Sequence, residues 1–148
     1  MRTQTFDGDV KWSETDASGR IHNTAVFRWA ESAEHALCYD LASDLATERL
    51  PRRRVEATYH RPLVFRDPYR VTLSVVRLGR TSITYAWTVT SRGELCVEGS
   101  HVAVHIDDDG RPTPWPEQFQ AAIAEQMTPH PTDSSDALVT HPPEGHHA

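Results

Sequence analysis

Residues 71–106, VTLSVVRLGRTSITYAWTVTSRGELCVEGSHVAVHI, decide the fold of this chain. Apolar and polar residues alternate along them, most regularly over 83–90, and a period of two is typical of strands that bury one face. Gly79-Arg80 and Arg92-Gly93 interrupt the alternation with residues typical of tight turns. The stretch therefore predicts three antiparallel strands joined by short connections, the last of them covering 95–106.

A long helix precedes these strands. Its apolar residues recur at helical spacing from about residue 24 to 46, and Asn23 and Thr24 are candidate caps at its start. Further strands are predicted over 2–12 and 54–65, where Pro62 would lie near an edge or a bulge, and a short final helix over 117–127. The order contains no strand–helix–strand alternation, so we expect an α+β fold in which a five-stranded antiparallel sheet wraps one long central helix.

Composition restricts the class of protein. The 148 residues suffice for one domain, which we assign to residues 1–127, and the Pro- and His-rich acidic remainder, 128–148, is predicted to be disordered. A net charge of -6 disfavours nucleic-acid binding, and no apolar run is long enough to cross a membrane. The N-terminus lacks an apolar signal region, and Cys38 and Cys96 have no metal-site spacing, so we expect a cytoplasmic protein with reduced thiols.

Five blocks, in this order, resemble the 4-hydroxybenzoyl-CoA thioesterase family of hotdog-fold acyl-CoA thioesterases. The first, WSETDASGRIHN at 12–23, is similar to the family pattern ETDxxGHVNN and precedes FRWAE at 27–31. The others are YHRPL at 59–63, LGRTS at 78–82 and GRP at 110–112. The resemblance covers nearly all of residues 5–120. It departs from the family at Arg20, where a His is frequent, and at Val26, where a Tyr is frequent, and the second change alters the expected acyl pocket.

The resemblance implies that Asp16 is the catalytic carboxylate. Thioester hydrolysis needs a nucleophile or base beside the carbonyl carbon and donors for the developing oxyanion. Free backbone N–H groups at a helix start can supply such donors, and the positive end of the helix favours an ionised carboxylate. By analogy the Asn23 N–H would polarise the thioester carbonyl. The substrate-binding residues predicted with them are Gly19, His22, Thr24, Val26, Arg80 and Ser82.

Other interpretations of the same residues stay open. Glu31 is a rival catalytic carboxylate, although an exposed helical glutamate in a salt bridge is the commoner explanation. Asp16 and His22 superficially resemble the polar pair of hotdog hydratases, which would make the chain an acyl-thioester hydratase or dehydratase. A non-catalytic acyl-thioester-binding protein is the third hypothesis. His101 and His105 share a strand face without a third metal ligand, so buried, hydrogen-bonded histidines are expected there.

The resemblance implies an acyl-CoA substrate and no metal or organic cofactor. Fourteen of the 15 basic residues are arginines, which suit phosphate groups, and the family comparison favours Arg80 and Ser82 as nucleotide contacts. The cluster Arg52-Arg53-Arg54 could instead dock an acyl carrier protein, which is acidic. An uncovered sheet face and edge favour a homodimer or homotetramer. Acyl chain length and aromaticity do not follow from the sequence.

Overall fold

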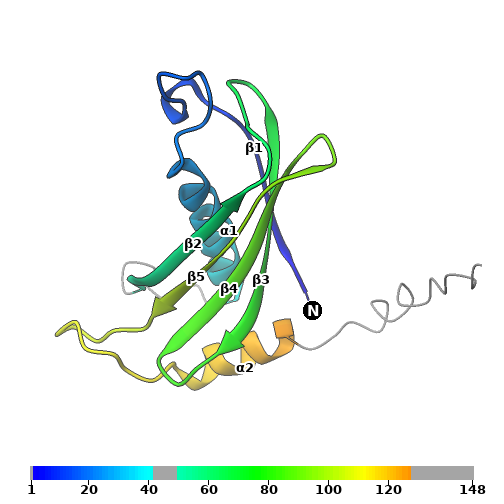
Figure 1. Cartoon of the computed structure of the whole chain (residues 1–148). Helices are drawn as coiled ribbons and strands as arrows, with labels where there is room; N and C mark the ends of the chain where they lie inside the picture. Colours follow the sequence, from blue (N-terminus) through cyan, green and yellow to red (C-terminus); the bar gives the residue numbers. More distant parts are fainter. Residues whose placement is uncertain (1, 42–49, 128–148) are drawn as a thin grey trace, which may run out of the picture.

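The structure is a computed structural model that describes residues 2–41 and 50–127 (Figure 1). The elements in chain order are β1 (Gln4–Asp9), a 3-10 turn (Trp12–Glu14), α1 (Ala25–Leu41), β2 (Arg52–Tyr59), β3 (Pro68–Leu78), β4 (Ser82–Ser91), β5 (Glu94–Val104) and α2 (Glu117–Met127). None of the described helices is both long and apolar enough to span a membrane. The predicted end of the long helix, at 46, and the predicted disordered tail, 128–148, lie outside the described residues.

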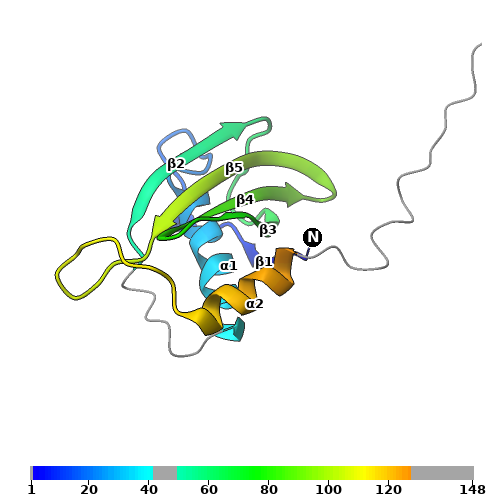
Figure 2. The same ribbon diagram turned by 90° about the horizontal axis from the view of Figure 1, so that it is seen from below.

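The five strands form one sheet in the order β1-β3-β4-β5-β2, with every neighbouring pair antiparallel. The sheet curves around α1, and α2 packs beside α1 at one end of that curve (Figure 2). The predicted fold class, a five-stranded antiparallel sheet around one long helix, is therefore confirmed. β1 and β2 are the two edges of the sheet.

The prediction of a strand over 54–65 was wrong in its second half. β2 ends at Tyr59, and the N–H groups of His60 and Arg61 both donate to the Cys96 carbonyl, at 2.8 and 3.1 Å. This shared acceptor ends the regular ladder, and Pro62 has no N–H with which to resume it. Residues 60–67 instead form the connection that passes beside the start of α1.

The core lies between the sheet and α1. The inward side chains of β4 alternate with half-buried ones, as the sequence predicted, and Tyr85 and Trp87 are among the largest buried residues. Trp87 packs edge-on against Phe27 of α1 and lies opposite Gly99 of β5. A Cβ atom at Gly99 would come within 2.4 Å of the Trp87 ring, so the glycine makes room for the indole.

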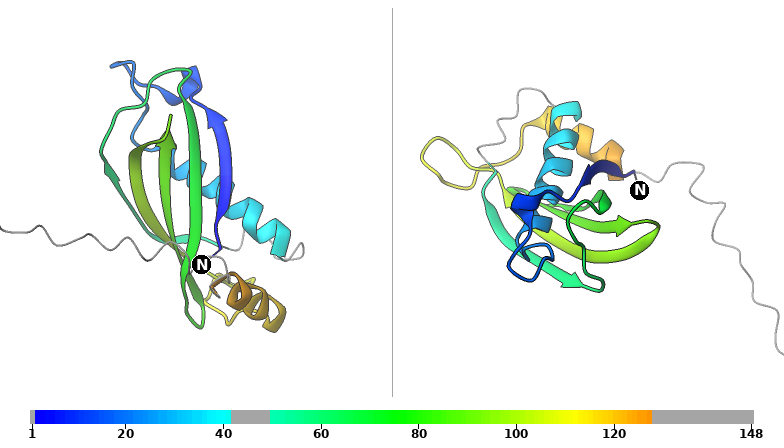
Figure 3. Two further views of the ribbon diagram at one scale, coloured as in Figure 1. Left: turned by 90° about the vertical axis from the view of Figure 1, so that its right-hand side faces the viewer. Right: turned by 90° about the horizontal axis from the view of Figure 1, so that it is seen from above.

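The two ends of the sheet are built differently. One end carries the 3-10 turn, the start of α1 and the end of β2, whereas the β3–β4 turn and α2 lie at the other end (Figures 1 and 3). α2 covers the second end through contacts with β3 and α1. In the segment just before α2, Trp115 donates its indole N–H to the Ser82 carbonyl at 3.2 Å and stacks on His105. The first end has no helix over it among the described residues and contains most of the predicted site.

Candidate active site

Asp16 lies on a tight hairpin between the 3-10 turn and α1. Thr15 and Ile21 form the bridge that closes this hairpin, and the Asp16 N–H donates to the Arg20 carbonyl at 2.9 Å. Gly19 donates its N–H to the Asp16 carbonyl at 3.0 Å with a φ of 79°, a left-handed conformation that favours glycine. Gly19, which the sequence analysis gave to substrate binding, therefore has a clear role in forming the turn.

The Asp16 carboxylate is exposed and has one oxygen free. Its Oδ1 accepts hydrogen bonds from the Ser18 N–H at 2.8 Å and from the Ser18 hydroxyl at 2.5 Å. These bonds, with smaller contributions from the charges of His22 and Arg20, lower the pKa of Asp16 below its usual value. No group of the described residues donates to Oδ2. The carboxylate is thus held ionised with one oxygen available.

The start of α1 is organised by His22. The His22 carbonyl accepts the Ala25 N–H at 2.9 Å, and the His22 ring Nδ1 accepts the Thr24 N–H at 3.3 Å and lies 2.7 Å from the Thr24 hydroxyl. The capping contacts therefore come from His22, where the sequence suggested Asn23 and Thr24. Within residues 2–41 and 50–127, nothing accepts a hydrogen bond from the Asn23 N–H. This amide is a free donor at the positive end of the helix.

Glu14 ties the hairpin to the helix, a role that sequence analysis did not predict. Its carboxylate accepts the Trp29 indole N–H at 2.5 Å and the Lys11 N–H at 2.8 Å, while its carbonyl accepts the His22 N–H at 2.7 Å. Trp29 in turn stacks on Tyr69 of β3 with 3.9 Å between ring centroids. One residue therefore joins the Asp16 hairpin, the start of α1 and the sheet. The only sequence signal was its place beside Asp16 in the family motif.

A surface groove of about 300 Å³ opens beside the hairpin and the helix start. Its lining residues are Arg20, Ile21, Asn23, Tyr59, His60, Arg61 and Pro62. Arg20 pairs with Asp16 across the hairpin, so the groove, the carboxylate and the free Asn23 amide lie in one region of the fold. Of the predicted site residues, Asn23 lines this groove, and Asp16 lies on the adjoining hairpin.

Comparison with known proteins identifies the family of this chain. The family model of the thioesterase-like superfamily matches residues 10–123. The chain belongs to the thioesterase-like superfamily. The family resemblance is thereby confirmed, and with it the expectation of a thioesterase at the level of the superfamily. No curated protein sequence matches the chain significantly.

Solved structures of thioesterases are similar to this superfamily member over most of its length. A predicted thioesterase from Bacillus stearothermophilus is 29% identical, with a TM-score of 0.77 over 84% of this chain and 96% of that one. A Thermus thermophilus thioesterase, complexed with coenzyme A and Zn, is 29% identical with a TM-score of 0.78 over 86% and 96%. A 1,4-dihydroxy-2-naphthoyl-CoA thioesterase from Synechocystis, 17% identical with a TM-score of 0.74 over 86% and 99%, shares the fold.

None of the six predicted substrate-binding residues lines the groove. Three of them, Gly19, His22 and Thr24, lie on the hairpin and at the helix start beside it, and the other three lie apart from it. Val26 has no exposed surface and belongs to the core of the single protomer. Arg80 and Ser82 lie on the β3–β4 turn, at the opposite end of the sheet from Asp16 (Figure 1). There the Ser82 carbonyl accepts the Gly79 N–H at 2.8 Å and the Arg80 carbonyl accepts the Trp115 N–H at 3.3 Å. Within one protomer they do not share a site with Asp16.

The rival carboxylate Glu31 lies on the solvent side of α1. Its side chain is 51% exposed, and its oxygens lie 3.8 Å from the His35 ring and 3.8 Å from the Arg52 guanidinium. This surface ion pairing agrees with the commoner explanation that the sequence analysis gave for Glu31. The Arg52 guanidinium also contacts Glu34, on the buried face of α1, and Arg54 pairs with Glu56 at 2.9 Å. The cluster at 52–54 therefore does not form one continuous basic surface.

A different glutamate on the same helix is fully buried. Glu34 has no exposed surface, and its carboxylate contacts the His101 ring at 2.9 Å and the Arg52 guanidinium at 3.0 Å. Burial alone would raise the pKa of Glu34, but the His101 hydrogen bond and the Arg52 charge outweigh it, and the pKa is lowered. His101 is thus a buried, hydrogen-bonded histidine, as expected. The sequence signal that we missed was the spacing of Glu34, four residues from both Ala30 and Cys38 on the apolar helix face.

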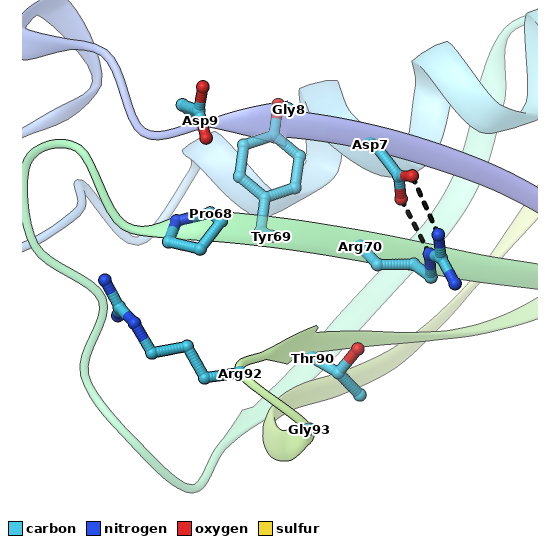
Figure 4. A pocket seen from close by; sticks show the side chains of 9 residues that line it. All are labelled: Asp7, Gly8, Asp9, Pro68, Tyr69, Arg70, Thr90, Arg92 and Gly93. Atoms are coloured by element: carbon cyan, nitrogen blue, oxygen red, sulfur yellow. Dashed lines mark hydrogen bonds and ion pairs between the residues drawn. The ribbon is translucent and has the colours of Figure 1, made fainter.

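A second groove, of about 570 Å³, lies at the ends of β1, β3 and β4 and contains none of the predicted site residues (Figure 4). Its two arginines are both occupied: Arg70 forms a double hydrogen bond with Asp7, and Arg92 contacts Asp67 at 2.8 Å. Within the part of the chain that the structure describes, no three His, Cys, Asp or Glu residues are grouped so that they could hold a metal ion.

Proposed function

We propose that this protein hydrolyses an acyl-CoA thioester to the free acid and thiol, with Asp16 as nucleophile or general base and the Asn23 N–H as oxyanion donor. The observation that carries the proposal is the free Asn23 amide at the start of α1, next to a hairpin that presents an ionised Asp16. Both groups that thioester hydrolysis requires are then supplied by the chain itself. The Thermus relative bound to coenzyme A supports a CoA thioester as the substrate class.

The chemistry follows from the two groups. As the carbonyl carbon is attacked, charge grows on the carbonyl oxygen, and a fixed N–H at a helix start stabilises that charge more than it stabilises the ground state. The lowered pKa of Asp16 keeps the carboxylate ionised near neutral pH, as either route demands. In the nucleophilic route Asp16 Oδ2 bonds to the carbonyl carbon and the thiolate leaves, giving an anhydride that water hydrolyses. In the general-base route Oδ2 removes a proton from the attacking water.

We further propose that the active unit is a homodimer or a homotetramer. The β2 edge pairs with no described strand on its outer side, and it exposes the apolar side chains of Val55 and Tyr59. Free strand edges of this kind pair readily with a second chain. Antiparallel pairing of two β2 edges would bring the β3–β4 turn of the partner subunit to the same end as the Asp16 hairpin. Arg80 and Ser82 could then contact the CoA nucleotide across subunits.

The experiment is a thiol-release screen against short, long, branched and aromatic acyl-CoA substrates. Each substrate is offered to the wild-type protein and to Asp16→Asn, and free thiol is measured over time. We expect release by the wild type and a loss of most turnover in the variant. Full activity of Asp16→Asn would reject Asp16, and the absence of release from every substrate would reject hydrolysis.

The other hypotheses give different products in the same screen. Water addition to an enoyl-CoA without thiol release would support the hydratase with Asp16 and His22. Thermal stabilisation by acyl-CoA without either product would support a binding protein. Acyl-carrier-protein thioesters form a parallel arm, in which faster release than from the matching acyl-CoA would assign the carrier protein as partner. Cytoplasmic location remains a prediction of the sequence alone.

A further inference from the structure

We infer that Tyr59 is a positioning residue that fixes the direction of the Asn23 N–H. The inference rests on the proposed function, because it gives Tyr59 a part in oxyanion stabilisation. Tyr59 is the last residue of β2, whereas Asn23 precedes α1, 36 positions earlier in the chain. The Tyr59 hydroxyl donates a hydrogen bond to the Asn23 carbonyl, and both residues line the same groove.

The bond fixes one of the two peptide groups that flank Asn23. The peptide group before Asn23 contains its N–H and the His22 carbonyl, and the Ala25 N–H holds that carbonyl at 2.9 Å. The peptide group after Asn23 contains its carbonyl and the Thr24 N–H. Tyr59 holds the first of these atoms, and the His22 ring holds the second, at 3.3 Å. With both planes fixed, the backbone dihedrals of Asn23 are fixed too, and its N–H is preorganised.

Tyr59 is well placed for this role, because the end of β2 that carries it is held by hydrogen bonds to β5. Tyr59 pairs with Val97 of β5, and the next two N–H groups along the chain donate to the Cys96 carbonyl. Partial burial raises the pKa of the Tyr59 phenol, so the hydroxyl keeps its proton and remains a donor. The side chain is 45% exposed at the groove, so its contribution to folding through core packing is small. The sheet, through this residue, sets the geometry of the helix start.

The test is Tyr59→Phe, which removes only the hydroxyl, with Tyr39→Phe as the matched control. Tyr39 is a 75% exposed tyrosine on α1, outside the groove. Thiol release is measured over a range of acyl-CoA concentrations. We expect kcat of Tyr59→Phe to fall about five- to tenfold with KM changed less than twofold, because losing an oxyanion donor itself costs about 100-fold or more and here the donor remains. Tyr39→Phe should match the wild type in both constants.

A readout independent of activity separates this inference from the proposed function. Amide hydrogen exchange of Ala25 and Thr24 should be faster in Tyr59→Phe by a few-fold, with no change in strands β3 and β4. A wild-type kcat in Tyr59→Phe, or a loss confined to KM, would overturn the positioning role while leaving the hydrolase intact. If the wild type releases no thiol, unchanged exchange at Ala25 and Thr24 would overturn the role by itself, because the hydroxyl would then fix nothing.

Discussion

Two carboxylates with lowered pKa values occupy opposite environments in this small domain. Glu34 is buried, with its oxygens in contact with His101 and Arg52. Asp16 is exposed, and among the residues that the structure describes only its Oδ1 has partners, the N–H and hydroxyl of Ser18. The pKa of each is lowered by hydrogen bonds to the charged form, yet one carboxylate is saturated and the other keeps a free oxygen.

The difference shows that the role of a carboxylate depends on whether its oxygens already have hydrogen-bond partners and on whether a substrate can reach it. A buried carboxylate whose partners are in place holds elements together: Glu34 comes from α1, Arg52 from β2 and His101 from β5. It has no surface on which a substrate could reach it. Asp16 is exposed, and Ser18 fixes one of its oxygens while, among the described residues, nothing donates to the other. We therefore propose that Glu34 serves folding stability and that Asp16 serves turnover.

The largest expected effect is on turnover in Asp16→Asn. Asparagine keeps the Oδ1 acceptor for Ser18, so the hairpin should persist, but the amide is neither a useful base nor a nucleophile. We expect kcat to fall about 1,000-fold, and the urea unfolding midpoint to stay close to that of the wild type, because the side chain is exposed. A residual activity above one tenth of wild type would remove the distinction between the two carboxylates.

The second effect is on stability in Glu34→Gln. The substitution leaves Arg52 and His101 without their charged partner in the core, a loss that typically costs about 3–5 kcal/mol. Urea unfolding measures it, and thiol release per folded molecule should remain near the wild-type value. Glu31→Gln is the matched control on the same helix, and we expect less than about 1 kcal/mol there, because exposed ion pairs contribute little. Equal losses in the two variants would contradict the assignment.

The pH dependence of the free energy of unfolding should also show the contribution of Glu34. The folded-state pKa of Glu34 lies below its unfolded value, so Glu34 stabilises the fold fully above the unfolded pKa. That contribution is lost as the pH falls through the unfolded value and then the folded one. The urea midpoint of the wild type should therefore fall on acidification more steeply than that of Glu34→Gln. Parallel curves for the two proteins would show that Glu34 is not the linked group.

The smallest effect is expected from Ser18→Ala. The serine hydroxyl is the largest cause of the lowered pKa of Asp16, so its removal raises that pKa. The acid limb of kcat/KM, which follows ionisation of Asp16 in the free enzyme, should move to higher pH, with the rate at neutral pH little changed. An acid limb that stays in place in Ser18→Ala would show that another group sets it.

The fold could be predicted from the sequence because alternation and helical periodicity are local signals. The strands predicted over 71–106 are present as β3, β4 and β5, although β3 begins earlier, at Pro68, and β5 ends at Val104; the long helix begins at Ala25, close to the predicted residue 24. The prediction over 54–65 failed because the end of β2 depends on a carbonyl of another strand, Cys96, that no local pattern reveals. The site residues came from the family motif, not from periodicity, and their roles remain proposals.

What could not be predicted consists of long-range polar contacts. The sequence analysis did not single out Glu34, although its spacing placed it on the buried face of the helix. Its partners Arg52 and His101 lie 18 and 67 positions away. Tyr59 and Glu14 could not be assigned for the same reason, since each acts through a contact made only after the sheet and α1 have packed together.

The most direct measurement is a crystal structure of the protein with a non-hydrolysable acyl-CoA analogue. We predict that the carbonyl oxygen of the analogue lies within about 3.2 Å of the Asn23 nitrogen, with Asp16 Oδ2 facing the carbonyl carbon. An analogue whose carbonyl binds elsewhere, for instance in the groove between Arg70 and Arg92, with the Asn23 N–H and Asp16 both facing solvent, would contradict this prediction.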